Sequence, residues 1–192
     1  MIDKALAIVA EELNSYFLRR KRNSEGKVIL SPLTNQDGSS AVKEQNKVVV
    51  SLVDLTEETL LKNQVRFREN SENKIGEVKP SVNLNLHILC SAYFAPANYQ
   101  ESLSYLSGVI AFFQMKPVFE SDNTPLMRTF GIERLVFEMQ HQDTNSKNNM
   151  WNSLGSKYLP SVLYKVRLIS FRDDNAGELL PGISGADSNL SS

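Results

Sequence analysis

The chain has 192 residues, of which 41% are hydrophobic and 22% are charged, and its formal net charge is −1. A chain of this length typically forms one domain that buries its core without disulfides or structural metals. The near-zero charge gives no overall positive field that would attract nucleic acid, so we expect no nucleic-acid partner. No segment approaches the roughly 20 apolar residues of a membrane span, so we expect no membrane insertion.

The N-terminal segment predicts an amphipathic helix. Its apolar residues recur at near-helical spacing, at Ile2, Leu6, Val9, Leu13 and Phe17. Asp3 can cap its start, and the helix should end in the basic run at residues 19–22, before Gly26. Cations at a helix C-terminus interact favourably with the helix dipole, by about 0.3–1 kcal/mol each. We therefore interpret the basic run as a helix end, with an ion pair at a protein interface as the alternative.

Two strand signals follow this helix. Residues 28–30 predict a short strand, and residues 31–45 are rich in Ser, Asn, Asp and Gly, which is typical of a loop. Residues 47–55 contain a β-branched run that favours a largely buried strand. Residues 56–61 fit either a continuation of that strand or a helical turn.

Residues 62–80 are polar and charged. Within them, Val65 and Phe67 alternate with Arg66 and Arg68. A structureless loop of this length is unusual inside a compact domain, so we predict an exposed two-stranded arm or an ordered interface.

The next segments predict a strand and a long helix. Residues 82–94 alternate between apolar and polar side chains, which indicates one buried and one wetter face. Asn98, with Glu101 three residues later, predicts a capped helix start. Pro117 should close this helix, and its apolar stripe should contain Tyr99, Leu103, Leu106, Ile110 and Phe113, widened by Val109 and Phe112.

The last elements complete an α+β pattern. We predict strands at residues 133–139 and 162–171, with a short helix at residues 146–158 between them. The whole pattern favours an α+β domain at residues 1–172, in which two or three helices pack on a mixed or largely antiparallel sheet. Residues 173–192 are acidic and rich in Gly and Ser, which predicts a flexible tail.

Residues that could carry catalysis or hold a metal are few. The two histidines and the single cysteine, Cys90, are too few for a zinc site, which needs about four ligands. His87 and Cys90 point to opposite faces of a predicted strand, so we interpret His87 as a surface or interface residue and Cys90 as a small core residue. A lone cysteine also excludes an internal disulfide, which is typical of a reducing cytosol. The first residues lack the pattern of a signal peptide.

Other catalytic patterns are missing as well. The sequence has no glycine-rich nucleotide loop and no serine nucleophile motif. Adjacent carboxylates occur at Glu11-Glu12, Glu57-Glu58 and Asp173-Asp174. Catalytic acids need burial or like-charge crowding, so we interpret these pairs as solvated faces. We expect no enzymatic activity, no cofactor and no metal.

The single tryptophan, Trp151, lies on the short helix predicted at residues 146–158. One tryptophan on such a helix usually anchors it to the core, but tryptophan is also enriched at interfaces. We favour core packing and keep an interface contact open.

Three stretches, in this order and spacing, resemble one known family. They are residues 46–63 (beginning NKVVVSLV), residues 84–125 (beginning LNLHIL and ending NTP) and residues 150–167 (MWNSLGSKYLPSVLYKVR). Together they resemble the N-terminal domain of the cap or tail-terminator proteins of contractile injection systems, such as the antifeeding prophage and the Photorhabdus virulence cassette. The resemblance runs over nearly the whole chain.

This resemblance implies a structural assembly protein, similar to phage tail-terminator subunits. Such a subunit would form a hexameric ring on the last layer of the inner tube, stop its elongation and contact the end of the sheath. It would assemble in the bacterial cytoplasm and become part of the injection particle. Two other functions stay open: a neck, baseplate or adaptor protein of the same kind of particle, and an unrecognised small-molecule-binding enzyme.

A closed head-to-tail ring requires each subunit to present two different faces. We expect these faces to use three elements: the arm, whose edge strands can pair with a neighbour, a proline-pinned segment from residue 116, and the turn at residues 151–160. The candidate interface residues are Val65, Arg66, Phe67, Arg68, Lys116, Pro117, Phe119, Asn123, Thr124, Pro125, Trp151 and Tyr158.

Overall fold

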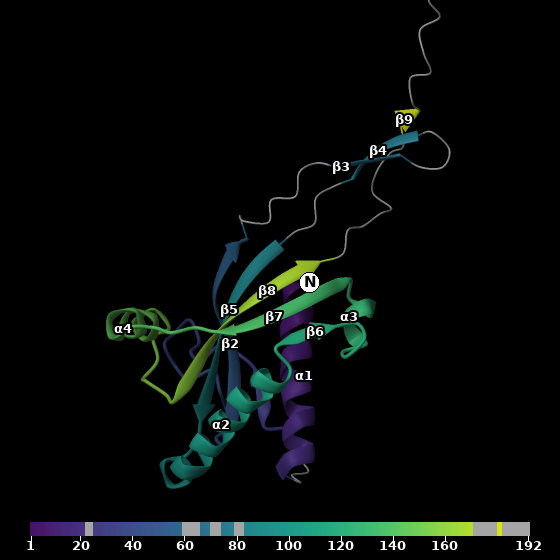
Figure 1. Ribbon diagram of the computed structural model, residues 1–192. Coiled ribbons are helices and arrows are strands. Elements are labelled where there is room, and N and C mark those ends of the chain that lie inside the picture. Colours follow the sequence, from purple (N-terminus) through teal and green to yellow (C-terminus); the bar gives the residue numbers. More distant parts are fainter. Residues whose placement is uncertain (22–24, 59–65, 70–73, 79–82, 171–179, 182–192) are drawn as a thin grey trace, which may run out of the picture.

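A computed structural model of the chain describes residues 1–21, 25–58, 66–69, 74–78, 83–170 and 180–181. Its centre is a six-stranded sheet in the order β1-β2-β5-β8-β7-β6 (Figure 1). The strands are β1 (Val28–Leu30), β2 (Lys47–Glu57), β5 (Asn83–Tyr93), β6 (Val118–Glu120), β7 (Ile132–Met139) and β8 (Ser161–Ser170). β1 runs parallel to β2, whereas the other neighbours are antiparallel. The predicted α+β class with a mixed, largely antiparallel sheet is confirmed.

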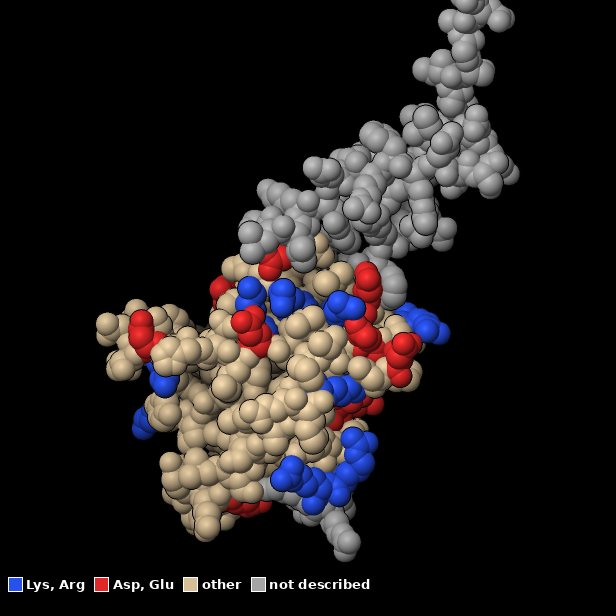
Figure 2. Space-filling view, viewed as in Figure 1, with Lys and Arg blue, Asp and Glu red and all other residues tan. Residues whose placement is uncertain are grey.

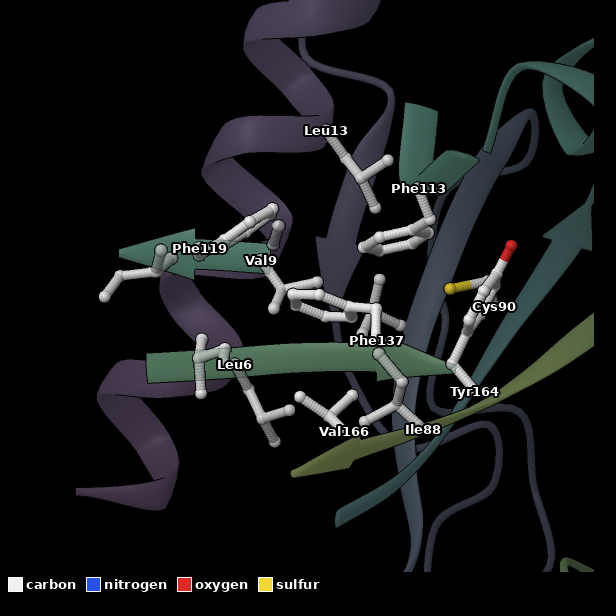
Figure 3. Close-up of a cluster of buried hydrophobic side chains, with 14 of the residues drawn as sticks. Leu6, Val9, Leu13, Ile88, Cys90, Phe113, Phe119, Phe137, Tyr164 and Val166 are labelled. Atoms are coloured by element: carbon white, nitrogen blue, oxygen red, sulfur yellow. The ribbon is translucent and has the colours of Figure 1, made fainter. Parts of the chain in front are cut away.

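Three helices pack on one face of this sheet: α1 (Ile2–Lys21), α2 (Tyr99–Met115) and α3 (Leu126–Thr129). The main core lies between them and the strands. Figure 3 shows side chains of α1, such as Leu6, Val9 and Leu13, beside the rings of Phe113 and Phe137. Each large side chain that is fully buried here stabilises the fold by about 1.5–3 kcal/mol.

A smaller cluster covers part of the opposite face. Trp151 of helix α4 (Thr144–Ser153) packs there with Val49, Leu89 and Leu163 of the central strands and with Leu33 of the loop. Residues 31–45 form this loop, as predicted, with one isolated bridge between Thr34 and Ser40. Core packing of Trp151, the favoured interpretation, is confirmed by its 5% exposure.

A second, smaller sheet contains the predicted arm. Strands β3 (Arg66–Glu69) and β4 (Lys74–Val78) pair antiparallel, and β9 (Leu180–Pro181) pairs with β4. Figure 1 shows this small sheet beyond the ends of β2, β5 and β8. Of the predicted tail at residues 173–192, β9 is the described part, and the rest lies outside the described residues. The two-stranded arm is confirmed.

The predicted stripe of helix α2 is confirmed at Leu106, Val109, Phe112 and Phe113, which are buried, and is wrong near the start of the helix. Tyr99 and Leu103, expected on the buried side, are 57% and 42% exposed. Gly108 lies on the buried side instead, where a Cβ atom would come within 2.5 Å of Phe17 Cε1. The small residue lets α2 approach α1 closely.

Several predicted element ends differ in detail. Asp3 lies inside the first turn of α1, where its carboxylate accepts a hydrogen bond from the N-terminal amine at 2.8 Å. Asn98 precedes α2, but its side chain makes no capping bond and donates to Asn46 Oδ1 at 3.0 Å. Both predictions of a side-chain cap were therefore wrong. The short elements β6 and α3 were not predicted, because elements of 3 and 4 residues are too short to show a periodic pattern of apolar side chains.

The second face of β5 is drier than predicted. Asn83, Asn85 and Ser91 are 9%, 6% and 0% exposed. Leu89, on the same face of β5, packs in the cluster around Trp151, so α4 and the loop cover part of this face. The alternation of apolar and polar residues in β5 therefore did not indicate that the polar face is exposed to solvent.

Candidate assembly surface

The groups that could act chemically are isolated or buried. Among the described residues, no cluster of three His, Cys, Asp or Glu side chains could hold a metal ion. Cys90 is fully buried, as predicted, and burial raises the pKa of its thiol to about 12. A thiol in that state is a poor nucleophile. None of the described helices combines the length and apolar character needed to cross a bilayer.

Two of the adjacent carboxylate pairs are less solvated than predicted. Glu12 forms an ion pair with Lys116, with Nζ and Oε2 2.8 Å apart. Glu58 is 8% exposed, and its Oε2 lies 3.9 Å from Lys165 Nζ. These carboxylates face cations rather than each other, so the arrangement is structural. Asp173 and Asp174 lie outside the described residues.

Lys116 joins three parts of the fold at the end of α2. Besides the contact with Glu12 of α1, its ammonium donates to the carbonyl of Asn123 at 2.9 Å. The same ammonium lies 4.7 Å from the centre of the Phe119 ring. Such a cation over a ring adds roughly 0.5–2 kcal/mol. Lys116 therefore fixes the candidate segment against the helix layer.

The rest of this segment is partly internal. Phe119 and Thr124 are 0% and 1% exposed, so they support the segment and present no surface to a partner. Asn123 closes the turn: its Oδ1 accepts from the Glu120 N–H at 3.1 Å and from the Thr124 hydroxyl at 2.9 Å. Pro117 and Pro125 are exposed and remain candidates for contact.

Trp151 and Tyr158 form an edge-to-face pair, with ring centres 5.6 Å apart. Trp151 is buried, whereas Tyr158 is 63% exposed. Between them the helix ends early, at Ser153, and Gly155 turns the chain with a φ of +62°. The buried ring thus holds an exposed aromatic in place, which suits a contact residue.

The predicted arm residues are only partly described. Val65 lies outside the described residues, and Arg66, Phe67 and Arg68 belong to β3. β3 is the outer strand of the small sheet, whose order is β3-β4-β9. One side of its backbone therefore has no partner strand among the described elements.

The structure adds an edge that the sequence did not indicate. β1 pairs with residues 48–50 of β2, and no described strand flanks residues 52–57 on that side. Leu52 and Leu55 are 38% and 44% exposed there. The β-branched run had predicted that this strand is largely buried. The sequence signal for an exposed end was the change from valines to Asp54 and Glu57 towards the end of the strand.

Charges are unevenly distributed over the surface. Figure 2 shows basic and acidic side chains mixed near the end of the molecule that adjoins the small sheet. One such pair joins two strands, with Arg134 Nη2 2.6 Å from Glu120 Oε1. The surface over α2 is almost free of charge, because Glu101 is the single charged residue of that helix. Protein interfaces typically have a core that is poor in charged residues and a polar rim, and the exposed face of α2 beside the charged end has this composition.

Comparison with known proteins places this fold. No curated protein sequence matches the chain significantly. One similar solved structure is the PVC sheath/tube terminator of an extracellular contractile injection system in its extended state, with a TM-score of 0.63 and 16% identity. That match covers 100% of this chain and 64% of the other.

A second similar structure is the tube-terminating cap of the anti-feeding prophage, with a TM-score of 0.56 and 16% identity over 95% of this chain and 60% of the other. The chain thus spans less than two thirds of either protein. The predicted similarity to tail-terminator subunits is confirmed for the fold. The sequence profile of the Pvc16 N-terminal domain matches residues 5–181. The chain belongs to the Pvc16 N-terminal domain family.

Proposed function

We propose that this chain is a structural, non-enzymatic protein that caps the tube end, the sheath end or both in a contractile injection system and stops elongation. The observation that carries this proposal is the shared fold with two terminators over 100% and 95% of the chain, together with the family match. The surface supports it, because exposed apolar residues lie on helix α2, whose single charged residue is Glu101, and the Cys90 thiol is buried.

The cap acts as a ring, and a hexamer matches a tube of six-fold symmetry. A closed head-to-tail ring uses two different faces of each subunit. Of the candidate residues with described side chains, Pro117, Asn123, Pro125 and Tyr158 are exposed and contact the tube, the sheath or a neighbouring subunit. The protein assembles in the bacterial cytoplasm and then remains part of the particle.

Particle length tests this function. Particles assembled without the chain should have tubes of uncontrolled length or lack sheath, and adding the chain back should restore a narrow length distribution in electron micrographs. A length distribution that does not depend on the chain would contradict the proposal.

A label on the chain locates it on the particle. A terminator carries the label at the end where elongation stops, away from the baseplate. A label at the baseplate would instead assign the chain to the alternative group of neck, baseplate or adaptor proteins.

A further inference from the structure

β2 is paired along its whole length on one side and along a short part on the other. Its register with β5 runs from Lys47, opposite Tyr93, to Glu57, opposite Leu84. On the other side, the Ser31 N–H donates to the Val50 carbonyl at 3.2 Å, and the Ser31 carbonyl accepts from the Ser51 hydroxyl at 2.7 Å. Pro32 follows at once, and proline has no N–H to continue a ladder.

The outer half of β2 exposes backbone groups that can accept another strand. The Leu55 N–H donates at 2.8 Å to the carboxylate of its neighbour Asp54 instead of to β5. This N–H therefore faces the open side, where an exposed carboxylate occupies it in place of a strand. Unpaired edges of this kind bind extended segments through main-chain hydrogen bonds.

A bulge gives this edge a distinctive pattern of side chains. The register shifts between Leu52 and Asp54, so Leu52 lies opposite Ile88 and Leu55 lies opposite Leu86. Directly opposite residues share a face of the sheet. Both leucines therefore lie on the helix-side face of the edge, although they are three residues apart.

The chemistry of the edge specifies its occupant. Asp54 and Glu57 are exposed acids, and the two leucines are exposed apolar side chains beside them. Asp54 lies opposite His87, so its side chain is on the other face of the sheet from the two leucines. An extended segment with basic residues on the Asp54 face and a large apolar residue on the leucine face would neutralise Asp54 and cover the leucines.

We propose that β3 of a second copy of this chain adds to the open edge of β2. β3 has the sequence Arg-Phe-Arg-Glu, so it brings two arginines and one aromatic residue. It is also the outer strand of the small sheet, and one side of its backbone has no partner strand among the described elements. Figure 1 shows the small sheet beyond the ends of the main strands.

This pairing is directional. The donor strand and the acceptor edge are different surfaces of one chain, so each copy donates to one neighbour and accepts from another. Such a contact is heterologous and generates a ring when the rotation closes. The inference deepens the ring of the proposed function, but it depends on self-association and not on binding to tube or sheath.

Charge reversal tests the pairing with the full chain. The acceptor variant Asp54→Lys and the donor variant Arg66→Glu/Arg68→Glu should each weaken self-association at least about tenfold in sedimentation velocity. A chain that carries all three changes should associate like the unchanged protein. The matched control is Glu133→Lys, an exposed acid on β7 in the other half of the sheet. Melting temperatures confirm that each variant is folded.

Cysteine pairs provide a test that does not depend on charge. A chain with Thr56→Cys is mixed with a differently tagged chain that has Arg66→Cys, Phe67→Cys or Arg68→Cys, so the mixed disulfide forms only between copies. A disulfide needs Cα atoms within about 7 Å. Cys90 is buried and does not compete. We expect one of the three mixtures to cross-link efficiently, and Glu133→Cys in place of Thr56→Cys to give no product.

The outcomes separate this inference from the proposed function. Unchanged association of both charge variants, or a chain that stays monomeric at all concentrations, overturns the pairing even if the chain still limits tube length. Loss of length control by the acceptor variant with unchanged self-association assigns the edge to a tube or sheath strand and also overturns it. Charge-swap rescue and cross-linking support it even if tube length does not respond to the chain, which would overturn only the capping function.

Discussion

At Gly108 the two long helices meet so closely that one hydrogen fills the space available. The Phe17 ring opposite is held by Tyr105 and Tyr16, whose ring centres lie 4.9 and 5.4 Å away. The ring therefore has little room to move when a methyl group is added. Alanine favours a helix over glycine by about 1 kcal/mol, so the sign of a substitution depends on this crowding.

We expect Gly108→Ala to destabilise the protein by about 1–3 kcal/mol, because overpacking outweighs the gain in helix propensity. Denaturant unfolding of the two proteins measures the change. Ser107→Ala, on the exposed side of the same helix, is the control and should change stability by roughly 0.5 kcal/mol or less. A Gly108→Ala protein as stable as the original would show that Phe17 moves freely.

Cys90 predicts a second observable at the residue scale. Its thiol is 0% exposed, and its pKa is raised to about 12 by burial. A thiol reagent should therefore react at the rate at which the native structure opens, and at once in denaturant. Rapid stoichiometric labelling of the native protein would contradict the packing of β5 against the helices.

At the scale of elements, α4 depends on a cap that is visible in the sequence. The Asp143 carboxylate accepts the Ser146 N–H at 2.7 Å, and this bond lowers the pKa of Asp143 below its ordinary value. A lowered folded-state pKa means that the stabilisation is complete above the unfolded-state pKa and is lost as the pH falls through the folded-state value.

Asp143→Ala should therefore lower the melting temperature at neutral pH, and the difference from the unchanged protein should shrink as the pH falls below the unfolded-state pKa of the carboxyl. Asp143→Asn keeps a capping oxygen without a titrating proton, so its difference from Asp143→Ala should persist at low pH. An Asp143→Ala effect that does not vary with pH would show that the cap contributes nothing through its charge.

The elements also show what hydrophobic pattern could predict. The central strands and the first helix could be predicted from hydrophobic patterns such as residues 47–55, because each buried position of these elements requires an apolar side chain. The close approach at Gly108 could not be predicted, since it depends on a ring of another helix. The open edge of β2 depends equally on where β1 stops. Tyr158 could be proposed for contact from its residue type, whereas the burial of Phe119 and Thr124 depends on the folded turn.

For the whole molecule, the two apolar clusters share their sheet. β2, β5 and β8 contribute side chains to both, with Val48, Val49, Ile88 and Leu89 as examples. A disturbance of either cluster is therefore transmitted through the same strands. We infer that the body unfolds as one cooperative unit.

Trp151 tests this inference, because it is the single tryptophan and lies in the smaller cluster. Its fluorescence and the far-ultraviolet circular dichroism should follow the same transition in denaturant. A fluorescence transition at lower denaturant concentration would mean that α4 and its cluster separate first.

The position of the arm in the chain has a consequence for protein engineering. β2 and β5 are direct neighbours in the sheet, and the Glu58 N–H donates to the Asn83 carbonyl at 3.0 Å where the chain leaves and re-enters the body. Residues 59–82 are therefore an insertion in a hairpin that is already closed at its base. A short turn can replace them without changing the register of the main sheet, and segments of other length or sequence can be grafted at the same point. The main sheet and its helices then stay unchanged, while the inserted segment determines how far the protein extends and which partner it binds.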